Sequence, residues 1–559
     1  MSDPIPTKNS RRFAELFVEI ERQFGVNSIA IEGVHLWPLV RGRLRKPFKV
    51  VDNPPPDDAE RKDSAASGWR SRFPGIIGRL LHPVQSPNEA PPVMTKSHPG
   101  ERQNEKMRGK APVLSREAAE VQAAAELDKI RQVGQVDFVV FARPNKYYQK
   151  FGAKRYAPIL DPVYEDLQAR GRVVALCEGA ALDFECVNSP VMFDTTAHMS
   201  LRRYFPRPVF PEALSRMEDI QRIVSAIEPS FRVEPGKVLF RYNSHAHKRK
   251  FYREVFASLK PRIVFFSSFT SWVPVTWACR EMGIPTVDIQ HGGQSSYHGY
   301  NTHYSCVPRD GYHMLPDFFW CWGFHNKEII RRWFPGGACR HIPLVGGNRW
   351  KAKWIGSRSL AMLSVEERAF VASLEARKPA ILVTPSHGVE ELLPRHLIEA
   401  MQQSPSWFWL IRLHPINRSP ETERKVRATL ERAGLNNYDT QYSTLLPLHV
   451  LLQHVHYHLT PFSTAAREAV DFGVPTTIID PIGKVDFAED IAEGMFVYAD
   501  TAGDIRGDIE RAVRGEHTKA PSFLETDDKY VNQLVDTVNR WRRQMLGVTQ
   551  DESAAEIGR

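Results

Sequence analysis

Residues 287–305, VDIQHGGQSSYHGYNTHYS, change abruptly from apolar side chains to glycine, histidine, serine and tyrosine. An imidazole can take up or release a proton near neutral pH, so His291 is a candidate general base. Gly292 and Gly293 have no side chain and let a ligand approach the backbone closely. We predict a ligand site at Gln290, His291, Gly292 and Gly293. The alternative is a histidine whose hydrogen bonds are satisfied by backbone groups in a glycine turn.

Residues 460–480, TPFSTAAREAVDFGVPTTIID, predict a strand end, a helix over 463–473 and a further strand. Ser463 and Thr464 stand at the expected helix N-terminus, where free N–H groups and the positive dipole end can hold phosphate. Glu468 lies four residues after Thr464 on the same helix face and could accept hydrogen bonds from ligand hydroxyls. The alternative is simple capping of the helix by Ser463.

Two more polar turns follow expected strands of the same half of the chain. In LIRLHPINR, His414 could donate a proton to a departing phosphate, and Arg412 could bind it or pair with a carboxylate of its own domain. In TPSHG, we expect Thr384, Ser386 and Gly388 to form a turn that approaches phosphate. Loops after parallel strands meet at one edge of a sheet, so these turns together predict a nucleotide-phosphate site.

The elements that position these residues form two series of alternating strands and helices. Strands are expected at 136–142, 172–177, 262–268, 286–290, 318–323, 380–386, 407–415, 456–462 and 475–480. Helices are expected at 212–227, 246–259 and 526–545, among others. Continuous apolar strands between helices indicate parallel sheets that are covered on both faces. The predicted fold class is therefore α/β, with two doubly wound Rossmann-like domains that face an interdomain cleft, and with a hinge at 341–359.

The composition divides the chain into five expected segments. They are an amphipathic and Trp-containing segment (1–52), a disordered insert (53–115), an N-terminal Rossmann-like domain (116–345), a C-terminal Rossmann-like domain (346–525), and a terminal helix with a tail (526–559). The insert is rich in proline, serine and charge, and such a composition buries too little apolar surface to fold alone.

Composition also bounds the class of protein. The chain has 559 residues, of which 42% are hydrophobic and 25% charged, as is typical of a soluble globular protein. No signal peptide and no apolar run of 18 residues are apparent, and the six cysteines form no CxxC pair, so we expect a cytoplasmic protein. The net charge of +9 suits an anionic partner, but no nucleic-acid-binding motif occurs and we expect no nucleic acid. The histidines at 291, 298, 303 and 313 lack the i,i+4 spacing of a helical zinc pair. Those at 454, 456 and 458 alternate on a strand and could share one face, but we expect two of the three to face solvent and therefore expect no metal.

The pattern S-T-x-x-x-E-A-x-x-x-G-x-P from Ser463 to Pro475, the upstream R-L-H-P and the glycine-containing turn after an earlier strand resemble bacterial GT-B glycosyltransferases. The nearest kin are capsule and surface-polysaccharide enzymes: polysialyltransferases, capsular Kdo transferases and CDP-glycerol glycerophosphotransferases. The resemblance spans roughly residues 130–520 and is most specific in the C-terminal half. Residues 31–41, I-x-G-x-x-x-W-P-L-x-R, also resemble the N-terminal segment of such transferases.

This resemblance implies a transferase that needs no metal and no cofactor. Residues 346–525 would bind a nucleotide-sugar donor, with a CMP-linked sugar favoured over a uridine one, and residues 116–345 would bind the acceptor. His414 would stabilise the leaving phosphate, and the base would be His291 or Asp161, a carboxylate in APILDPVYEDL. Thr476 stands eight residues after Glu468, where many retaining GT-B enzymes have a second glutamate, which favours inversion.

The resemblance also implies a lipid-linked saccharide acceptor at the inner face of the cytoplasmic membrane. We expect the basic surface and the Trp-containing N-terminal segment to contact this anionic face peripherally. Two other classes stay open. One is a UDP-N-acetylglucosamine 2-epimerase-like enzyme, which would convert a free nucleotide sugar without an acceptor. The other is a non-catalytic scaffold of a capsule assembly complex.

Overall fold

The computed structural model describes residues 15–44, 114–142, 148–205, 208, 210–227, 233–292, 304–334, 339–354, 360, 362–386, 391–414, 419–516 and 524–547. The chain divides into two units, Met1–Lys49 with Arg116–Arg559, and Val50–Ser115. Every helix and strand given below belongs to the first unit. The expected insert lies outside the described residues except for its last two, and so do Gly293 and Gly388.

Seven parallel strands form the first sheet, in the order β11-β10-β9-β8-β3-β6-β7. They are β3 (Phe138–Ala142), β6 (Val173–Glu178), β7 (Val191–Phe193), β8 (Ile263–Ser267), β9 (Thr286–Ile289), β10 (Phe318–Cys321) and β11 (Ile342–Val345). Five of them lie where apolar runs predicted strands, whereas the short β7 and β11 were not predicted. The hinge expected at 341–359 is therefore wrong at its start, because Ile342–Val345 pairs in parallel with β10.

Alternate residues of the first sheet enter two separate cores, as the period of two along a strand requires. On β3, Val139 and Phe141 face one core, while Phe138 and Val140 face the other. The first core is covered by α4 (Arg116–Arg131), α7 (Pro211–Ile227), α8 (Pro235–Leu259), α9 (Val273–Glu281) and α10 (Phe324–Arg331). The second core is covered by α5 (Asp161–Gln168) and α22 (Asp528–Leu546).

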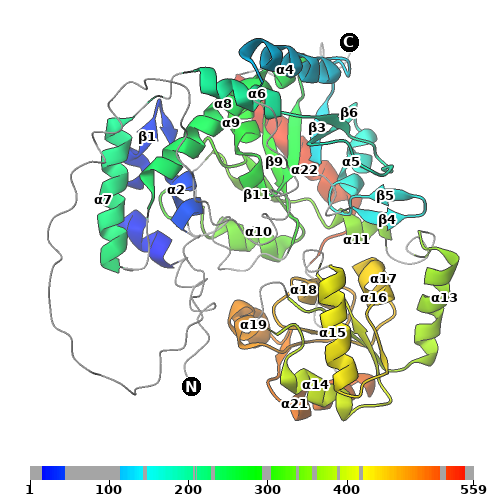
Figure 1. Cartoon of the computed structure of the whole chain (residues 1–559). Coiled ribbons are helices and arrows are strands. Elements are labelled where there is room, and N and C mark those ends of the chain that lie inside the picture. The colour runs from blue at the N-terminus through cyan, green and yellow to red at the C-terminus, as the bar shows by residue number, and fades with distance from the viewer. Residues whose placement is uncertain are drawn as a thin grey trace. The chain divides into compact units, whose positions relative to one another are not determined.

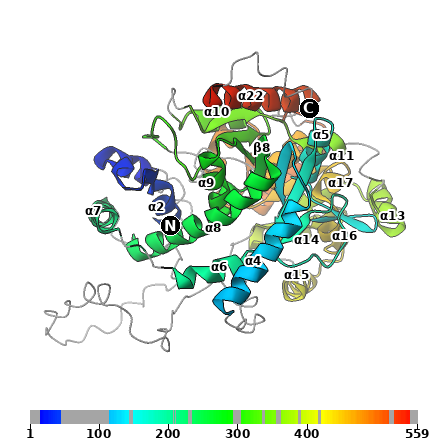
Figure 2. The same ribbon diagram turned by 90° about the horizontal axis from the view of Figure 1, so that it is seen from above.

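The terminal helix α22 returns to the first sheet instead of ending on the second. Its apolar side chains Val531, Leu534, Val535 and Val538 are buried against β3, β8 and β10. Figure 1 shows α22 in red beside the cyan and green elements of the first sheet, and Figure 2 shows α22 and α8 on opposite sides of β8. The last helix of the chain therefore completes the layer of the first sheet.

Six parallel strands form the second sheet, in the order β14-β13-β12-β15-β16-β17. They are β12 (Ala380–Val383), β13 (Phe408–Ile411), β14 (Tyr438–Asp439), β15 (Tyr457–Thr460), β16 (Thr476–Ile478) and β17 (Val497–Tyr498). The associated helices are α13 (Val365–Ser373), α14 (Arg395–Gln402), α15 (Pro420–Arg432), α16 (Tyr442–Leu445), α17 (Leu448–Leu452), α18 (Ala465–Asp471), α19 (Pro481–Asp486), α20 (Ala488–Ala492) and α21 (Ala502–Val513). Two doubly wound parallel sheets confirm the predicted fold class.

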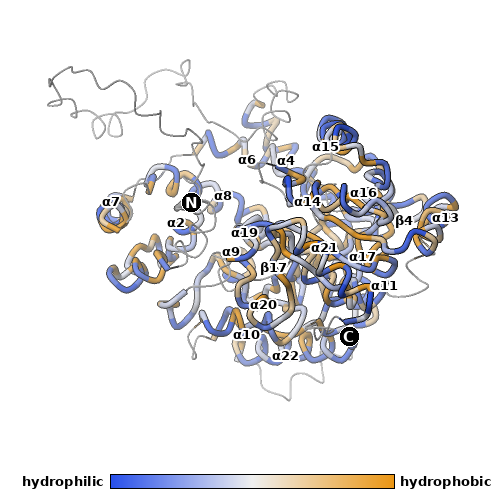
Figure 3. Tube along the Cα trace, turned by 90° about the horizontal axis from the view of Figure 1, so that it is seen from below, coloured by the Kyte–Doolittle hydropathy of each residue, from blue (hydrophilic) through white to orange (hydrophobic). Residues whose placement is uncertain are grey.

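Shorter elements join or flank the sheets. They are the hairpin β4 (Gln149–Phe151) and β5 (Lys154–Tyr156), the helices α6 (Thr196–Leu201) and α11 (Arg349–Trp354), and the single turns η2 (Arg202–Tyr204), η3 (Phe269–Ser271) and η4 (Leu374–Ala376). In Figure 3 the outer helix α15, sequence PETERKVRATLER, is drawn largely blue, in keeping with its solvent-facing charges. Within the described ranges, no helix is both long enough and apolar enough to cross a membrane.

The N-terminal segment packs into the core of the first sheet. It consists of helical residues 15–23, η1 (Val26–Ser28), β1 (Ala30–Ile31), β2 (Val34–His35) and α2 (Trp37–Leu44). Trp37 is fully buried, and its indole donates to Glu21, which also pairs with the buried Arg41. In the described part of this segment, Trp37 and Arg41 hold a buried carboxylate, so these two side chains are not available for the expected membrane contact.

Candidate functional site

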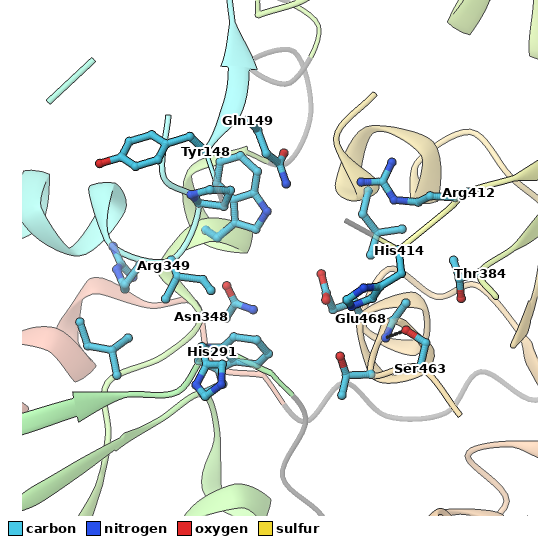
Figure 4. A pocket seen from close by; sticks show the side chains of 18 of the residues that line it. Tyr148, Gln149, His291, Asn348, Arg349, Thr384, Arg412, His414, Ser463 and Glu468 are labelled. Carbon is cyan, nitrogen blue, oxygen red and sulfur yellow. Dashed lines mark hydrogen bonds between the residues drawn. The ribbon is translucent and has the colours of Figure 1, made fainter. Parts of the chain in front are cut away.

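A cavity of about 400 Å³ opens between the carboxyl ends of the two sheets, and its size is that of a small-molecule site. Its first wall comes from β4, β9, β10 and neighbouring turns, and its second wall from the turns after β12, β13 and β15. The sequence-predicted residues that line it are His291, Thr384, Arg412, His414, Ser463, Thr464 and Glu468. Figure 4 shows His291 on one side of the opening, with His414, Ser463 and Glu468 on the other. Side chains from turns far apart in sequence thus share one space.

Ser463 and Thr464 precede α18, which begins at Ala465 and not at the expected position 463. The Ser463 hydroxyl accepts from Ala465 N at 3.3 Å, while Thr464 is exposed and its side chain makes no cap hydrogen bond. Thr464 also meets the first wall, since a Cβ added to Gly292 would lie 3.9 Å from its hydroxyl. Both hydroxyls can donate to an anionic ligand in the cavity.

Glu468 is a carboxyl group of the second wall, next to the turn before α18. Burial, together with the nearby Asp471, raises the pKa of Glu468 to about 7, although the Arg412 guanidinium acts in the opposite direction. The group therefore changes charge near neutral pH. Below pH 7 it can donate a hydrogen bond to a ligand oxygen, and above pH 7 it can only accept one.

Arg412 and His414 leave β13 in different directions. The Arg412 guanidinium donates to the carbonyls of Ser443, at 2.8 Å, and of Leu446. Arg412 thus lines the cavity and also binds backbone carbonyls of its own domain. The sequence had suggested a carboxylate of that domain as its alternative partner. His414 is half-buried, and its imidazole lies beside Glu468 in the opening (Figure 4).

The turn after β12 contributes one predicted residue to the cavity. The Thr384 hydroxyl is 2.8 Å from Nε2 of His458, a fully buried histidine whose other ring nitrogen meets Thr476. Burial lowers the pKa of His458 to about 3, so its ring is neutral and anchors Thr384. Ser386 is buried and accepts from Phe462 N at 3.0 Å, which joins this turn to the turn before α18. Ser386 therefore supports the wall without lining it.

The predicted residues of the first wall differ in role. His291 follows β9 and faces the cavity, whereas Gln290 is buried behind it. The Gln290 amide donates to Gly292 O at 2.9 Å and accepts from Trp322 N at 2.8 Å, so it fixes the backbone of the turn. Gln290 therefore positions the glycine turn and does not line the cavity.

Asp161, the rival base, is absent from the described residues that line the cavity. It begins α5, is 5% exposed, and accepts from Ala157 N at 2.6 Å. Burial raises the pKa of Asp161 to about 7, against the effect of its bond from Ala157 and with that of nearby Glu165. Its carboxyl group accepts from the backbone of its own turn, whereas His291 lines the cavity.

Several lining residues were not predicted from the sequence. Gln149, on the β4–β5 hairpin, faces the cavity in Figure 4, and its amide oxygen has no hydrogen-bond partner among the described residues. Asn348 faces the same space and caps α11 through its bond from Lys351 N at 2.9 Å. The glycine pair at 346–347, directly before Asn348, is the feature of the sequence that could have indicated a functional turn here. A Cβ on Gly346 would lie 2.2 Å from the ring of Trp320, so only glycine fits there.

The remaining features of the cavity are aromatic rings and charge. Trp320, Trp322, Trp350 and Tyr148 line it, and such rings can stack on sugars or bases. Arg349 lines it as well, but its guanidinium binds Asp166 at 2.6 Å and Asp528. Within the described ranges, no group of three or more His, Cys, Asp or Glu side chains is arranged to hold a metal.

No family model matches the chain, and no curated protein matches it. Among solved structures it is similar to MnaA of S. aureus with UDP (12% identity, TM-score 0.43, 74% of this chain and 97% of that one). It is also similar to a UDP-GlcNAc 2-epimerase from Neisseria meningitidis bound to UDP-GlcNAc (14%, 0.43, 72% and 98%). A third similar structure is the glycotransferase of kitacinnamycin (11%, 0.38, 76% and 98%). Similarity at this level carries no inference about chemistry, which has to come from the cavity.

Proposed function

We propose that the chain is an inverting GT-B glycosyltransferase of bacterial surface-polysaccharide synthesis, capsule or lipopolysaccharide, that uses a nucleotide-activated sugar, with a CMP-linked donor favoured. One observation carries the proposal. A single cavity of ligand size is lined by His291 after one parallel sheet and by His414, Ser463 and Thr464 after the other. Ligands of open parallel sheets bind at this edge, and two such edges facing each other suit a donor and an acceptor.

The second wall is the donor side in this proposal. Ser463 and Thr464 offer hydroxyl donors, and His414 offers a cationic or proton-donating ring, for the phosphate that leaves the sugar. Donors aimed at the charge that develops on a leaving group usually give the largest catalytic contribution. Glu468, with its pKa of about 7, is protonated in part of the molecules at neutral pH and then repels that phosphate less.

The first wall is the acceptor side. His291 takes the proton of an acceptor hydroxyl as its oxygen attacks the anomeric carbon of the donor sugar. The bond from that carbon to the phosphate oxygen breaks, its electron pair leaves with the nucleotide, and the configuration inverts. The half-buried ring of Trp322 holds the sugars by stacking. The reaction requires no metal and no cofactor.

The proposed acceptor is a lipid-linked saccharide at the inner face of the cytoplasmic membrane. Its support is the net charge of +9, which favours an anionic surface. The buried Trp37 does not contribute to this contact. The protein would therefore approach the membrane peripherally, through basic residues and not through Trp37.

Product analysis tests the reaction. The full chain is incubated with CMP-sialic acid, CMP-Kdo or UDP-N-acetylglucosamine, each with and without membranes from capsulated bacteria, and the nucleotide and sugar products are separated by chromatography. Sugar transfer that requires the membranes, at an inverted anomeric centre, is expected, and His291→Gln should abolish it. Conversion of UDP-N-acetylglucosamine to an epimer without any acceptor would identify the epimerase alternative. Absence of turnover and of nucleotide binding would leave the scaffold.

A further inference from the structure

Ser268 follows β8 in a left-handed backbone conformation, with φ 58° and ψ 67°. This region is unfavourable for any residue with a Cβ and is usually occupied by glycine. Four non-glycine residues with positive φ occur among those described: Glu32, Lys260, Ser268 and His341. Of these four, Ser268 is the one in hydrogen-bond contact with a residue that lines the cavity.

Buried contacts hold the Ser268 turn in this conformation. Phe269 N donates to Oδ1 of Asp288, at 3.1 Å, and Asp288 is a buried residue of the neighbouring strand β9. The Trp272 indole donates to Ser267 O at 3.1 Å, on the other side of Ser268. Backbone strain that persists because surrounding contacts enforce it is commonly found at functional sites.

The Ser268 hydroxyl meets the candidate base. Its Oγ lies 3.0 Å from Nε2 of His291, which is within hydrogen-bond distance. Both residues also line a niche of about 30 Å³ beside the main cavity, whose other walls are largely apolar and include Ala157, Pro158 and Leu160.

We propose that Ser268 is a positioning residue for His291, and that the strained turn exists to present its hydroxyl to the imidazole. The bond restricts the rotation of the ring and biases which ring nitrogen carries the proton. The catalytic consequence rests on the proposed function, but the contact itself is a property of the unliganded protein. Ser268 therefore acts through His291 and need not touch the substrate.

Imidazole NMR tests the contact without any activity assay. The full chain is labelled with ¹⁵N-histidine, and His291→Gln assigns the His291 ring signals. Ser268→Ala and Ser268→Gly should both shift the His291 nitrogen signals and change the ratio of the two neutral tautomers. Lys260→Gly, at another left-handed position at the end of α8, is the matched control and should leave these signals unchanged.

The Ser268 variants should change the Tm of the protein and the tautomer ratio of His291 independently of each other. Ser268→Gly removes strain and hydroxyl together, so the Tm should rise while the His291 signals change. Ser268→Thr keeps the hydroxyl but puts a branched side chain at positive φ, so the Tm should fall while the tautomer ratio stays near that of the wild type. If Ser268 merely completed the fold, the tautomer ratio would follow the Tm.

Kinetics then test the consequence. With whichever nucleotide sugar turns over, Ser268→Ala and Ser268→Gly should lower kcat at least tenfold at unchanged KM, and Lys260→Gly should not. Unchanged His291 signals in both variants would overturn the proposal. Altered signals in a protein that binds no nucleotide would keep the Ser268–His291 contact and reject the transferase, so the two failures are distinguishable.

Discussion

The two walls of the cavity are built from the same element, a turn after a parallel strand, but they carry different chemistry. The second wall presents hydroxyl, imidazole and carboxyl groups at Thr464, His414 and Glu468. The first wall presents one imidazole, His291, together with the amides of Gln149 and Asn348 and aromatic rings such as Trp322. In the proposed function, the hydroxyl and imidazole donors of the second wall suit the phosphate of a nucleotide, and the amides and rings of the first wall suit sugars.

Two carboxyl groups show the same contrast at single residues. Burial raises the pKa of both Asp161 and Glu468 to about 7. The Asp161 carboxyl group accepts a hydrogen bond from Ala157 N in its own turn, whereas Glu468 lines the cavity. A perturbed pKa therefore marks a functional group only where geometry gives that group access to a ligand.

The largest effect should come from His291 on the first wall. His291→Gln should lower kcat by about 10²–10⁴-fold, since general base catalysis contributes that much. Nucleotide affinity should stay within about twofold, because the donor phosphate lies on the other wall. Steady-state turnover and calorimetry on the same preparation measure both quantities. An equal loss of affinity and turnover would abolish the assigned division between the walls.

His414 should show the opposite pattern. His414→Ala removes a charge-assisted hydrogen bond to phosphate, worth about 1.5–3 kcal/mol, so nucleotide affinity should fall about tenfold to a hundredfold. Ser419→Ala, which removes the cap of the nearby α15 outside the cavity, is the matched control and should bind nucleotide normally. Calorimetric titration compares them. Equal nucleotide affinities in the two variants would mean that the phosphate does not bind at the second wall.

Replacing Asp161 should change stability and not binding. Its folded-state pKa of about 7 lies above the usual value, so the folded protein holds the proton more tightly and the charged carboxyl destabilises it as pH rises from about 4 to 7. Asp161→Asn keeps the acceptor for Ala157 N and should raise the free energy of unfolding at pH 8 by about 1–2 kcal/mol. Denaturation at pH 8 and pH 5 should show this gain shrinking toward acid. Loss of turnover in Asp161→Asn would instead restore Asp161 as the base.

Glu468 should produce the smallest effect, a pH dependence of binding. Deprotonation through its pKa of about 7 places a negative charge beside the phosphate, so nucleotide affinity should fall severalfold as pH rises from 6 to 8. Glu468→Gln removes this one titration and leaves those of the phosphate and of the cavity histidines, so it is the control. The same pH dependence in both proteins would mean that Glu468 does not face the phosphate.

The sequence predicts one wall of the site better than the other. His414 follows the apolar run of β13, and Ser463 and Thr464 follow β15, so the positions of these two strands place the turns after them. On the first wall, His291 was found in the same way, but Gln149 was not. Its strand β4 is three residues long and pairs only within a hairpin, so no apolar run announces it.

The missed strand β11 has a similar physical reason. Its four residues, IPLV, contain a proline and are followed by two glycines, which indicate a turn when they are read alone. In the structure, Gly346 is required by the ring of Trp320, and Gly347, at φ 82°, lies close to Glu525 O. These contacts join residues far apart in the sequence, so the need for glycine at both positions cannot be read from the local sequence. The return of α22 to the first sheet is likewise a tertiary fact that its amphipathic sequence does not specify.

Calorimetric titration of the full chain with CMP, CDP, UDP and GDP tests whether the second wall binds the phosphate of a nucleotide. We expect selective binding of one nucleotide, with the cytidine nucleotides favoured, and at least tenfold weaker binding in His414→Ala and in Ser463→Ala. Binding of none of the four nucleotides, or equal binding by the wild type and both variants, would contradict this expectation.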